Sequence, residues 1–180
     1  MTTTEQSPGD KPELPTSPEA LLDRLLQLGI KAVTVRHPPV HTVEESKAMR
    51  GDLPGCHCKT LLLKDKKGGL WLVVAGEDTS VDLKTLHLRL GSGRLSFAGA
   101  EVLWRVLGVR PGSVTPFALV NDTEGRVTVV LDAVMMACDL VNYHPLENDR
   151  TTALSPGDLL NFIKACGHVP SVIGLRADGA

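Results

Sequence analysis

Apolar residues recur at helical spacing in several stretches of the chain. The clearest begins at Ser17, which precedes a proline at the first helical position, carries a face of leucines and ends at Gly29. A more polar stretch, 42–51, has Thr42 and Glu45 at capping-box spacing and predicts a surface helix. The same spacing predicts helices at 80–91, 100–108 and 155–167, and one or two helical turns at 133–140.

Shorter apolar runs bounded by turn residues predict strands. The runs 58–65 and 70–75 flank Lys66-Lys67-Gly68-Gly69, and we expect a β-hairpin there. The runs 117–122 and 126–132 predict a second hairpin across a Thr-Glu-Gly turn. Residues 109–116 hold two prolines and a glycine and predict a loop. Further strands are expected at 30–37, 94–97, 141–145 and 171–175.

Helices and hairpins therefore alternate without a regular strand–helix–strand rhythm. This order predicts an α+β fold with a mixed, largely antiparallel sheet. The length of 180 residues favours a single domain, which we place at 17–175. Polar residues dominate 1–16 and predict a disordered tail, and 176–180 form a second short tail.

Composition narrows the function classes. The net charge is −2, and aromatic residues make up 3% of the chain. A general electrostatic attraction to nucleic acid is therefore excluded, as is a base-stacking platform, while a local basic surface stays open. The chain shows neither a signal peptide nor an apolar run long enough to span a bilayer, so we expect a cytoplasmic protein without membrane contact. In a reducing compartment its four cysteines are expected to be thiols.

The stretch "GCHCK", 55–59, offers three kinds of chemistry. Cys56 and Cys58 are separated by one residue, whereas structural zinc pairs are separated by two to four, and no second pair follows. A catalytic thiol would need a base, but His57 alternates with the cysteines along a strand and faces the other way. We therefore interpret both cysteines as small buried hydrophobic residues and expect no metal.

Three other features allow functional and structural interpretations. Lys59 starts a strand, where its side chain can reach a pocket mouth, although a solvated surface lysine is the common case. His144 follows a strand within a polar stretch and could equally be a satisfied structural histidine. The loop 112–116 could present backbone N–H groups to an oxyanion, or be a plain connector.

Three blocks of the chain, "CKTLLLKD", "GSVTPFALVND" and "LVNYHPLENDRTTALS", resemble the free-standing prolyl-tRNA editing proteins, the YbaK-like deacylases. The resemblance covers about residues 17–174, in the order and spacing of that family. It implies a mixed sheet curled into a partial barrel with flanking helices. It also implies hydrolysis of the ester between a wrong amino acid and its tRNA, usually alanine on proline tRNA, without a cofactor.

The resemblance also implies roles for particular residues. Lys59 matches the signature functional lysine, and His144 matches a histidine that lines the pocket. Many alanine-clearing members carry asparagine after the lysine, whereas this chain has Thr60, so the preferred amino acid among alanine, serine and threonine stays open. The loop thought to hold the carbonyl and amino end of the substrate matches Gly112, Ser113, Val114, Thr115 and Pro116, with Gly112 beside Lys59 as the catalytic pair.

An aminoacyl ester is already activated, so these residues could support hydrolysis by a positioned water, assisted by the terminal ribose hydroxyl. Loop N–H groups would stabilise the oxyanion, and Lys59 would clamp the terminal nucleotide. The expected partners are the acceptor end of tRNA and prolyl-tRNA synthetase. A non-catalytic module that binds aminoacyl-tRNA or the synthetase is the alternative. Phosphate contacts are expected from Lys47, Arg50, Lys64, Lys66 and Lys67, although the hairpin lysines could simply form a solvated turn.

Overall fold

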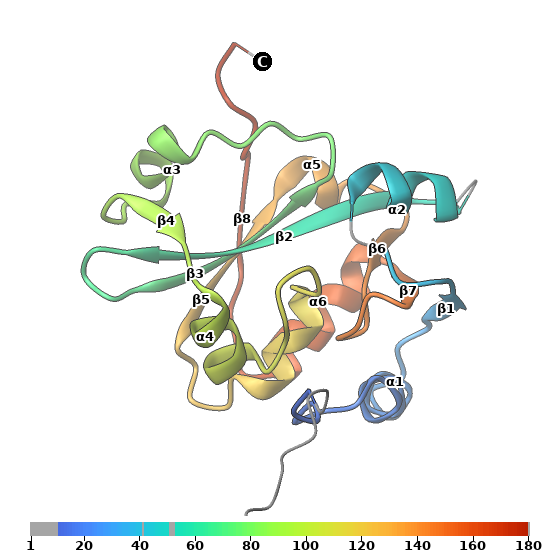
Figure 1. The fold of residues 1–180 in the computed structure, drawn as a ribbon. Coiled ribbons are helices and arrows are strands. Elements are labelled where there is room, and N and C mark those ends of the chain that lie inside the picture. The colour runs from blue at the N-terminus through green and yellow to red at the C-terminus, as the bar shows by residue number, and fades with distance from the viewer. Residues whose placement is uncertain (1–10, 41, 51–52, 180) are drawn as a thin grey trace, which may run out of the picture.

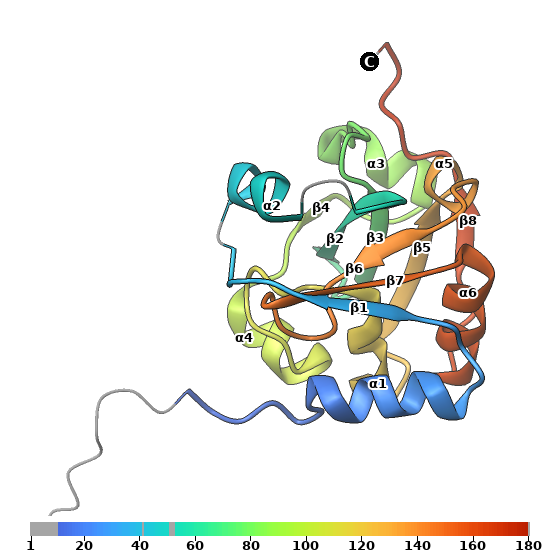
Figure 2. The ribbon, with the colours of Figure 1, turned by 90° about the vertical axis from the view of Figure 1, so that its right-hand side faces the viewer.

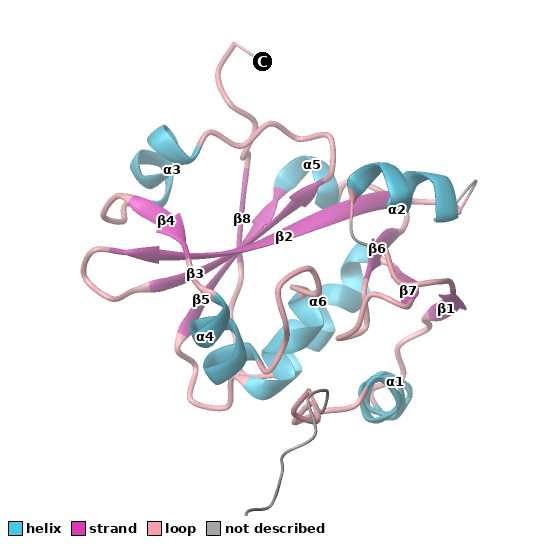
Figure 3. Ribbon diagram, in the orientation of Figure 1, coloured by secondary structure: helices cyan, strands magenta, loops and turns pink. Residues whose placement is uncertain are grey.

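A computed structural model describes residues 11–40, 42–50 and 53–179 of the chain (Figures 1 and 3). Within these ranges the strands form one mixed sheet in the order β1-β7-β6-β2-β3-β5-β8, with β4 paired to β2. The strands are β1 (Val33–Arg36), β2 (Cys56–Asp65), β3 (Leu70–Gly76), β4 (Leu95–Phe97), β5 (Val127–Asp132), β6 (Val141–Tyr143), β7 (Arg150–Leu154) and β8 (Ser171–Ile173). The helices are α1 (Pro18–Gln27), α2 (Val43–Arg50), α3 (Leu83–Leu90), α4 (Ala100–Val102), the π-helix η1 (Leu103–Leu107), the 3-10 helix η2 (Pro116–Asn121), α5 (Ala133–Met136) and α6 (Pro156–Ala165).

The pairing confirms the predicted fold class. β1–β7, β6–β7, β2–β3 and β2–β4 are antiparallel, whereas β2–β6, β3–β5 and β5–β8 are parallel. Figure 2 shows β1, β7 and β6 running across the molecule at a steep angle to β2, β3 and β5. The sheet therefore curls strongly, but β1 and β8 end its path without meeting, so the barrel is partial.

Side-chain caps fix the helix starts that the sequence predicts. Ser17 Oγ accepts from the N–H of Ala20 at 3.1 Å, and Ser155 Oγ accepts from that of Asp158 at 3.1 Å. At α2, the Thr42 hydroxyl accepts from Glu45 N at 3.0 Å, and the Glu45 carboxylate accepts from Thr42 N at 3.3 Å. This reciprocal pair is the predicted capping box. None of the helices within the described ranges has the length and apolar character that spanning a bilayer requires.

The predicted second hairpin is wrong. Residues 116–121 form η2, which begins at Pro116 and is capped by the Thr115 hydroxyl, an acceptor for Phe117 N at 3.3 Å. Its residues Pro116 to Leu119 are buried, so the run is apolar on every side, and hydrophobic spacing cannot distinguish such a helix from a strand. β5 instead extends the sheet in parallel beside β3.

The sequence analysis also missed β7, because its residues are polar. Thr152 is fully buried and Arg150 is 5% exposed. The Arg150 guanidinium donates to Asp149 Oδ1 at 2.9 Å and to Glu19 Oε1 at 2.9 Å, which pairs the charge and fastens α1 to the strand.

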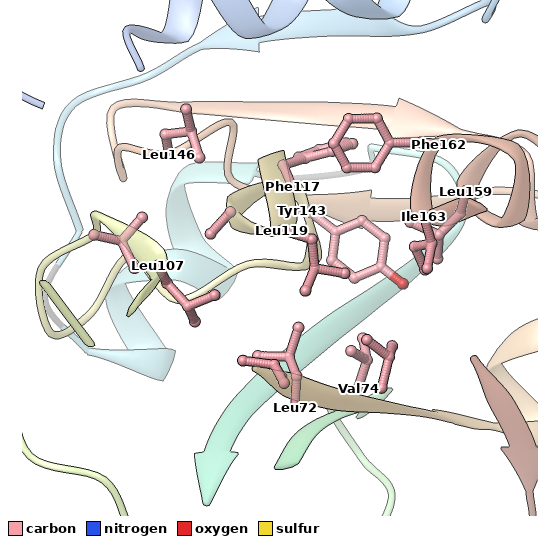
Figure 4. Packing of buried hydrophobic residues seen from close by; sticks show 14 of the residues in the cluster. Leu72, Val74, Leu107, Phe117, Leu119, Tyr143, Leu146, Leu159, Phe162 and Ile163 are labelled. Atoms are coloured by element: carbon pink, nitrogen blue, oxygen red, sulfur yellow. The ribbon is translucent and has the colours of Figure 1, made fainter. Parts of the chain in front are cut away.

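Two hydrophobic clusters cover opposite faces of the central strands. Alternate residues divide between them: Leu62 and Leu72 face the larger cluster, whereas Leu63 and Val73 face the smaller one beneath α3. Phe117, Tyr143 and Phe162 meet edge to face in the larger cluster, bringing η2, β6 and α6 together above β3 (Figure 4). This core fixes the strand ends that surround the site.

The expectation of four free thiols is wrong for one pair. Cys56 and Cys138 form a disulfide, with their Cα atoms 6.3 Å apart, while Cys58 and Cys166 are free. Cys56 opens β2 and Cys138 precedes β6, and these two strands pair with each other. Residues far apart in the sequence therefore meet through sheet pairing that the sequence analysis did not predict.

We expect Cys138→Ala to lower the free energy of unfolding by about 2–4 kcal/mol, because the bond closes a long loop. Denaturant titration of the oxidised protein measures this. Cys166→Ala is the matched control, since it removes a half-buried cysteine that forms no bond. Equal losses in the two variants would show that the disulfide does not stabilise the fold.

Candidate functional site

The site lies at a gap in the pairing of β2. One edge of β2 pairs with β3 from Cys58 to Lys64. The other edge meets β6 at Cys56 and His57, and β4 only from Leu63 onward. A cavity of about 750 Å³ opens at this gap, where Lys59 and Thr60 are both among its lining residues.

The backbone of Thr60 faces the gap. Cys56 N donates to Leu140 O at 2.8 Å, and Leu62 O accepts from Ala98 N at 2.9 Å, both away from β3. Backbone groups of an antiparallel strand alternate between its edges, so the N–H and C=O of Thr60 point the same way. Within the described ranges no strand lies opposite them, which leaves a donor and an acceptor for a ligand.

The Lys59 ammonium is held by a relay of polar groups. Its Nζ donates to the carbonyl of Thr79 at 2.6 Å, and the Thr79 hydroxyl donates to Asp132 Oδ2 at 3.2 Å. Asp132 is fully buried, and its other oxygen accepts from Leu175 N at 3.1 Å. An ammonium has three N–H bonds, so two remain for a ligand in the cavity.

The predicted substrate loop begins with a tight turn. Ser113 N donates to Arg110 O at 3.0 Å, and the two residues between them are Pro111 and Gly112. Gly112 has φ +86°. Proline followed by a residue of positive φ is the signature of a type II turn, and glycine adopts that φ without strain. The turn presents Pro111 and Gly112 to the cavity.

Only some of the loop N–H groups are available to bind an oxyanion. The Ser113 N–H is used in the turn, and Pro116 has none. The loop residues that line the cavity are Gly112 and Val114, and their N–H groups have no hydrogen-bond partner in the described part of the chain. Ser113, Thr115 and Pro116, also predicted to bind substrate, are buried and are not among the residues that line the cavity.

His144 follows β6 and lines the same cavity. Its Nδ1 lies 3.1 Å from the carbonyl of Arg150, which can only accept, so Nδ1 carries the proton and Nε2 is an acceptor in the neutral ring. Burial lowers the pKa of His144 below its usual value, and the neighbouring His37 ring, 6.1 Å away between centroids, lowers it further. The imidazole is therefore neutral near pH 7.

The cavity also includes polar residues that the sequence analysis did not select. Glu77 and Asp78 directly follow β3, with Glu77 N donating to His57 O at 2.8 Å, and Asn142 and Asn148 come from β6 and the segment after it. Glu77 and Asp78 could have been found from the sequence, because they are polar residues that directly follow the apolar run of β3.

The predicted phosphate-binding residues divide into two groups. Lys47 of α2 lines the cavity and lies 3.9 Å from Asp78, whereas the side chain of Arg50 lies outside the described residues. Lys64, Lys66 and Lys67 belong to the hairpin end, and Figure 1 shows that end of β2 pointing away from α2. They are therefore not part of the cavity wall.

Cysteine chemistry does not fit the geometry. Burial raises the pKa of Cys58 to about 11, and its thiol donates to the carbonyl of Cys56 at 3.3 Å. A thiol with that pKa is protonated at neutral pH and is a poor nucleophile. Cys56 and Cys58 pack against the larger core cluster but are only partly buried, and Cys56 is part of the disulfide rather than a free thiol. In the ranges that the structure describes, no three His, Cys, Asp or Glu side chains gather as a metal site would require.

Residues 37–162 match the family model of the aminoacyl-tRNA editing domain. The chain belongs to this family. The editing domain is 42% identical over 159 residues to prolyl-tRNA synthetase associated domain-containing protein 1 of Bos taurus, covering 86% of this chain and 92% of that protein. It is 37% identical over 158 residues to the prolyl-tRNA editing protein ProX of Acetoanaerobium sticklandii, covering 87% and 96%. The resemblance noted in the sequence is confirmed.

Solved structures show the same fold. A crystal structure of a candidate trans-editing enzyme for prolyl tRNA synthetase superposes on the editing domain with a TM-score of 0.69 at 20% identity, covering 90% of this chain and 98% of that one. At that level of identity the likeness concerns the fold alone.

We expect the His144 ring to titrate with a midpoint below about 6.5, the usual histidine value. Because the unfolded chain takes up this proton more readily, His144 should cost stability as the pH falls from about 6.5 through the folded pKa, and nothing above that range. NMR titration of the imidazole measures the midpoint, and His144→Gln identifies its resonance. The same variant should show a smaller loss of stability between pH 7.5 and 5. A midpoint at or above 6.5 would contradict the buried neutral ring.

Proposed function

We propose that this protein is a trans-editing hydrolase that removes wrongly attached alanine from proline tRNA. One observation carries the proposal: a single cavity is lined by residues that carry a charged donor, two unpaired N–H groups and a neutral imidazole acceptor. They belong to Lys59, to Gly112 with Val114, and to His144. The names of the bovine and Acetoanaerobium relatives point to the same tRNA.

The reaction requires little from the protein beyond placement. A water oxygen attacks the ester carbonyl, the bond from that carbon to the ribose oxygen breaks, and a proton from the water passes to the released ribose oxygen, which becomes a hydroxyl. The products are the free amino acid and intact tRNA. His144 Nε2 can accept a hydrogen bond from the water or from the substrate's amino group, because the ring is neutral and Nδ1 is already used.

Gly112 and Val114 would stabilise the oxyanion. The Gly112 N–H lies within the type II turn and needs little reorganisation during the reaction, and Val114 follows the turn directly after the buried Ser113. Removing one such donor typically costs about 100-fold or more in rate. Lys59, anchored at Thr79, would hold the terminal phosphate or ribose with its remaining donors and so orient the ester.

Selection would rest on size. A pocket that accepts a methyl side chain can exclude the proline ring, whereas a synthetase site that holds proline cannot strongly reject alanine. An added hydroxyl is weakly discriminated by an apolar pocket, so serine is the closest competitor and threonine the next. Thr60 lines the cavity beside Lys59 and is the residue through which we expect this preference to be set.

Recognition of the rest of the tRNA would use cations both at the cavity and beyond it. Lys47 is well placed near the substrate, and Lys64, Lys66 and Lys67 would meet phosphates only farther along β2. Prolyl-tRNA synthetase is the partner that would supply mischarged tRNA. The alternative is a module of the same fold that binds aminoacyl-tRNA or the synthetase without hydrolysis. Thr60 supports this alternative, because many alanine-clearing members carry asparagine at that position.

Lys59→Ala should lower kcat/KM for alanyl-tRNA(Pro) by about 100-fold, because the ester loses its orienting clamp. Release of labelled alanine measures this, with seryl-, threonyl- and prolyl-tRNA(Pro) as parallel substrates. Lys84→Ala is the control, an exposed lysine of α3 outside the cavity and outside the proposed tRNA-binding residues, and should stay within about twofold of wild type.

Loss of alanine with prolyl-tRNA spared would establish the editing activity. Deacylation that is equally fast in Lys59→Ala would refute the clamp. Binding of tRNA without loss of any amino acid would support the non-catalytic module instead.

Thr60→Asn should raise the preference for alanyl- over seryl-tRNA(Pro) by about tenfold, since an amide offers two donors and an acceptor where a hydroxyl offers one donor. The ratio of the two kcat/KM values measures the change. An unaltered ratio would show that the Thr60 side chain does not set the preference.

A further inference from the structure

The segment before α1 is packed against the base of the substrate loop. Thr16 Oγ1 donates to Asn121 Oδ1 at 2.6 Å, and Asn121 Nδ2 donates to Leu107 O at 2.8 Å. Pro15 lies so close to Gly108 that a Cβ there would overlap it. Figure 2 shows the segment entering α1 along the lower side of the α4 region. Residues 11–16, which the sequence analysis assigns to the tail, are therefore part of the folded unit.

Arg110 lies where this segment meets the loop. Its guanidinium donates to the carbonyl of Pro12 and lies 3.9 Å from the carboxylate of Glu147. It also lies over the Trp104 ring, 5.3 Å from the centroid, in a cation–π arrangement. One side chain thus contacts the N-terminal segment, η1 and the connection between β6 and β7.

Arg110 is linked to the proposed reacting groups in two ways, through its own backbone and through Glu147. Arg110 is the first residue of the type II turn that presents Gly112, and its carbonyl closes that turn. Glu147 follows His144 by three residues. Between them, Leu146 has φ +75°, a conformation that costs a non-glycine residue about 1–3 kcal/mol. Such a conformation persists only where its surroundings enforce it, and Leu146 is 1% exposed.

We propose that Arg110 is a positioning residue for the hydrolysis, and that residues 11–17 are the strap that fixes its guanidinium. Arg110 sets the distance between the oxyanion donors on the Gly112 turn and the imidazole of His144. The inference rests on the proposed function, whose reacting groups it places.

The size of the expected effects on rate and on folding distinguishes a positioning role of Arg110 from a stabilising one. The Arg110–Glu147 pair is partly exposed, with side chains 28% and 40% accessible, and its atoms are 3.9 Å apart. Pairs of this kind contribute little to the free energy of unfolding. Small displacements of reacting groups, in contrast, cost large factors in rate. Removing the guanidinium should therefore affect turnover much more than folding.

The test compares Arg110→Ala, Arg110→Lys and the control Arg126→Ala in the full chain. Arg126 is also a partly exposed arginine paired with a glutamate, Glu124, and it lies outside the cavity. Arg110→Ala should lower kcat for alanyl-tRNA(Pro) by about tenfold with KM within about twofold. Lysine keeps the charge but not the planar fork, so Arg110→Lys should recover part of the loss. Arg126→Ala should match wild type.

A second measurement does not depend on activity. Amide hydrogen exchange at Ser113, whose N–H closes the turn by donating to Arg110 O, should quicken in Arg110→Ala. It should also quicken in Thr16→Val, which removes a hydrogen bond of the strap without changing Arg110. Exchange in β3 should stay unchanged in both variants.

The proposal is overturned if exchange at Ser113 is unaffected, or if kcat in Arg110→Ala equals that of wild type. A wild-type protein that hydrolyses no aminoacyl-tRNA would overturn the proposed function, and the exchange result would then decide the strap alone. Lost activity with global loosening across β3 would also count against positioning, because it would mark Arg110 as a general stabilising residue.

Discussion

The structure depends on the pairing of a single strand with both halves of the sheet. β2 pairs with β6 through its first residues and with β3 through the rest, and β4 joins only near its far end. Between these partners one edge of the strand is open, and there the backbone of Thr60 and the side chain of Lys59 reach a cavity rather than a neighbour. A continuous sheet would satisfy this edge with another strand and would leave no site. The gap thus defines the binding site before any particular side chain is considered.

Much of the architecture follows from local signals in the sequence. Ser17, Thr42 and Ser155 mark helix starts because their oxygens satisfy N–H groups that a helix leaves unpaired, and the structure shows each of these caps. The first hairpin follows from two apolar runs around a glycine turn. Signals of this kind fail where burial is complete. Around Phe117 every position is apolar, and in β7 the buried Thr152 is polar, so neither stretch shows the spacing that its structure would produce.

The candidate site was likewise only partly predictable from local signals in the sequence. Residue chemistry alone left Lys59, His144 and the Gly112 loop open between functional and structural interpretations, and only the resemblance to a family selected them. The structure places these residues on one cavity and adds what no spacing could reveal. The relay from Lys59 through Thr79 to Asp132 joins three strands' ends, and the tautomer of His144 depends on the carbonyl of Arg150. The relay and the tautomer both depend on contacts between residues far apart in the sequence, which spacing along the chain does not reveal.

The disulfide between Cys56 and Cys138 has a topological consequence. It closes a covalent ring that contains both Lys59 and Gly112, whereas His144 lies on the chain outside it. A single backbone break anywhere within the ring, such as one in the exposed turn between β2 and β3, leaves the two fragments joined by the sulfur bridge. All three groups around the cavity therefore stay in one covalent molecule after such a cut, because the fragment that contains Cys138 also carries His144. The oxidised protein is in this sense protected against separation by proteolysis over nearly half of its length.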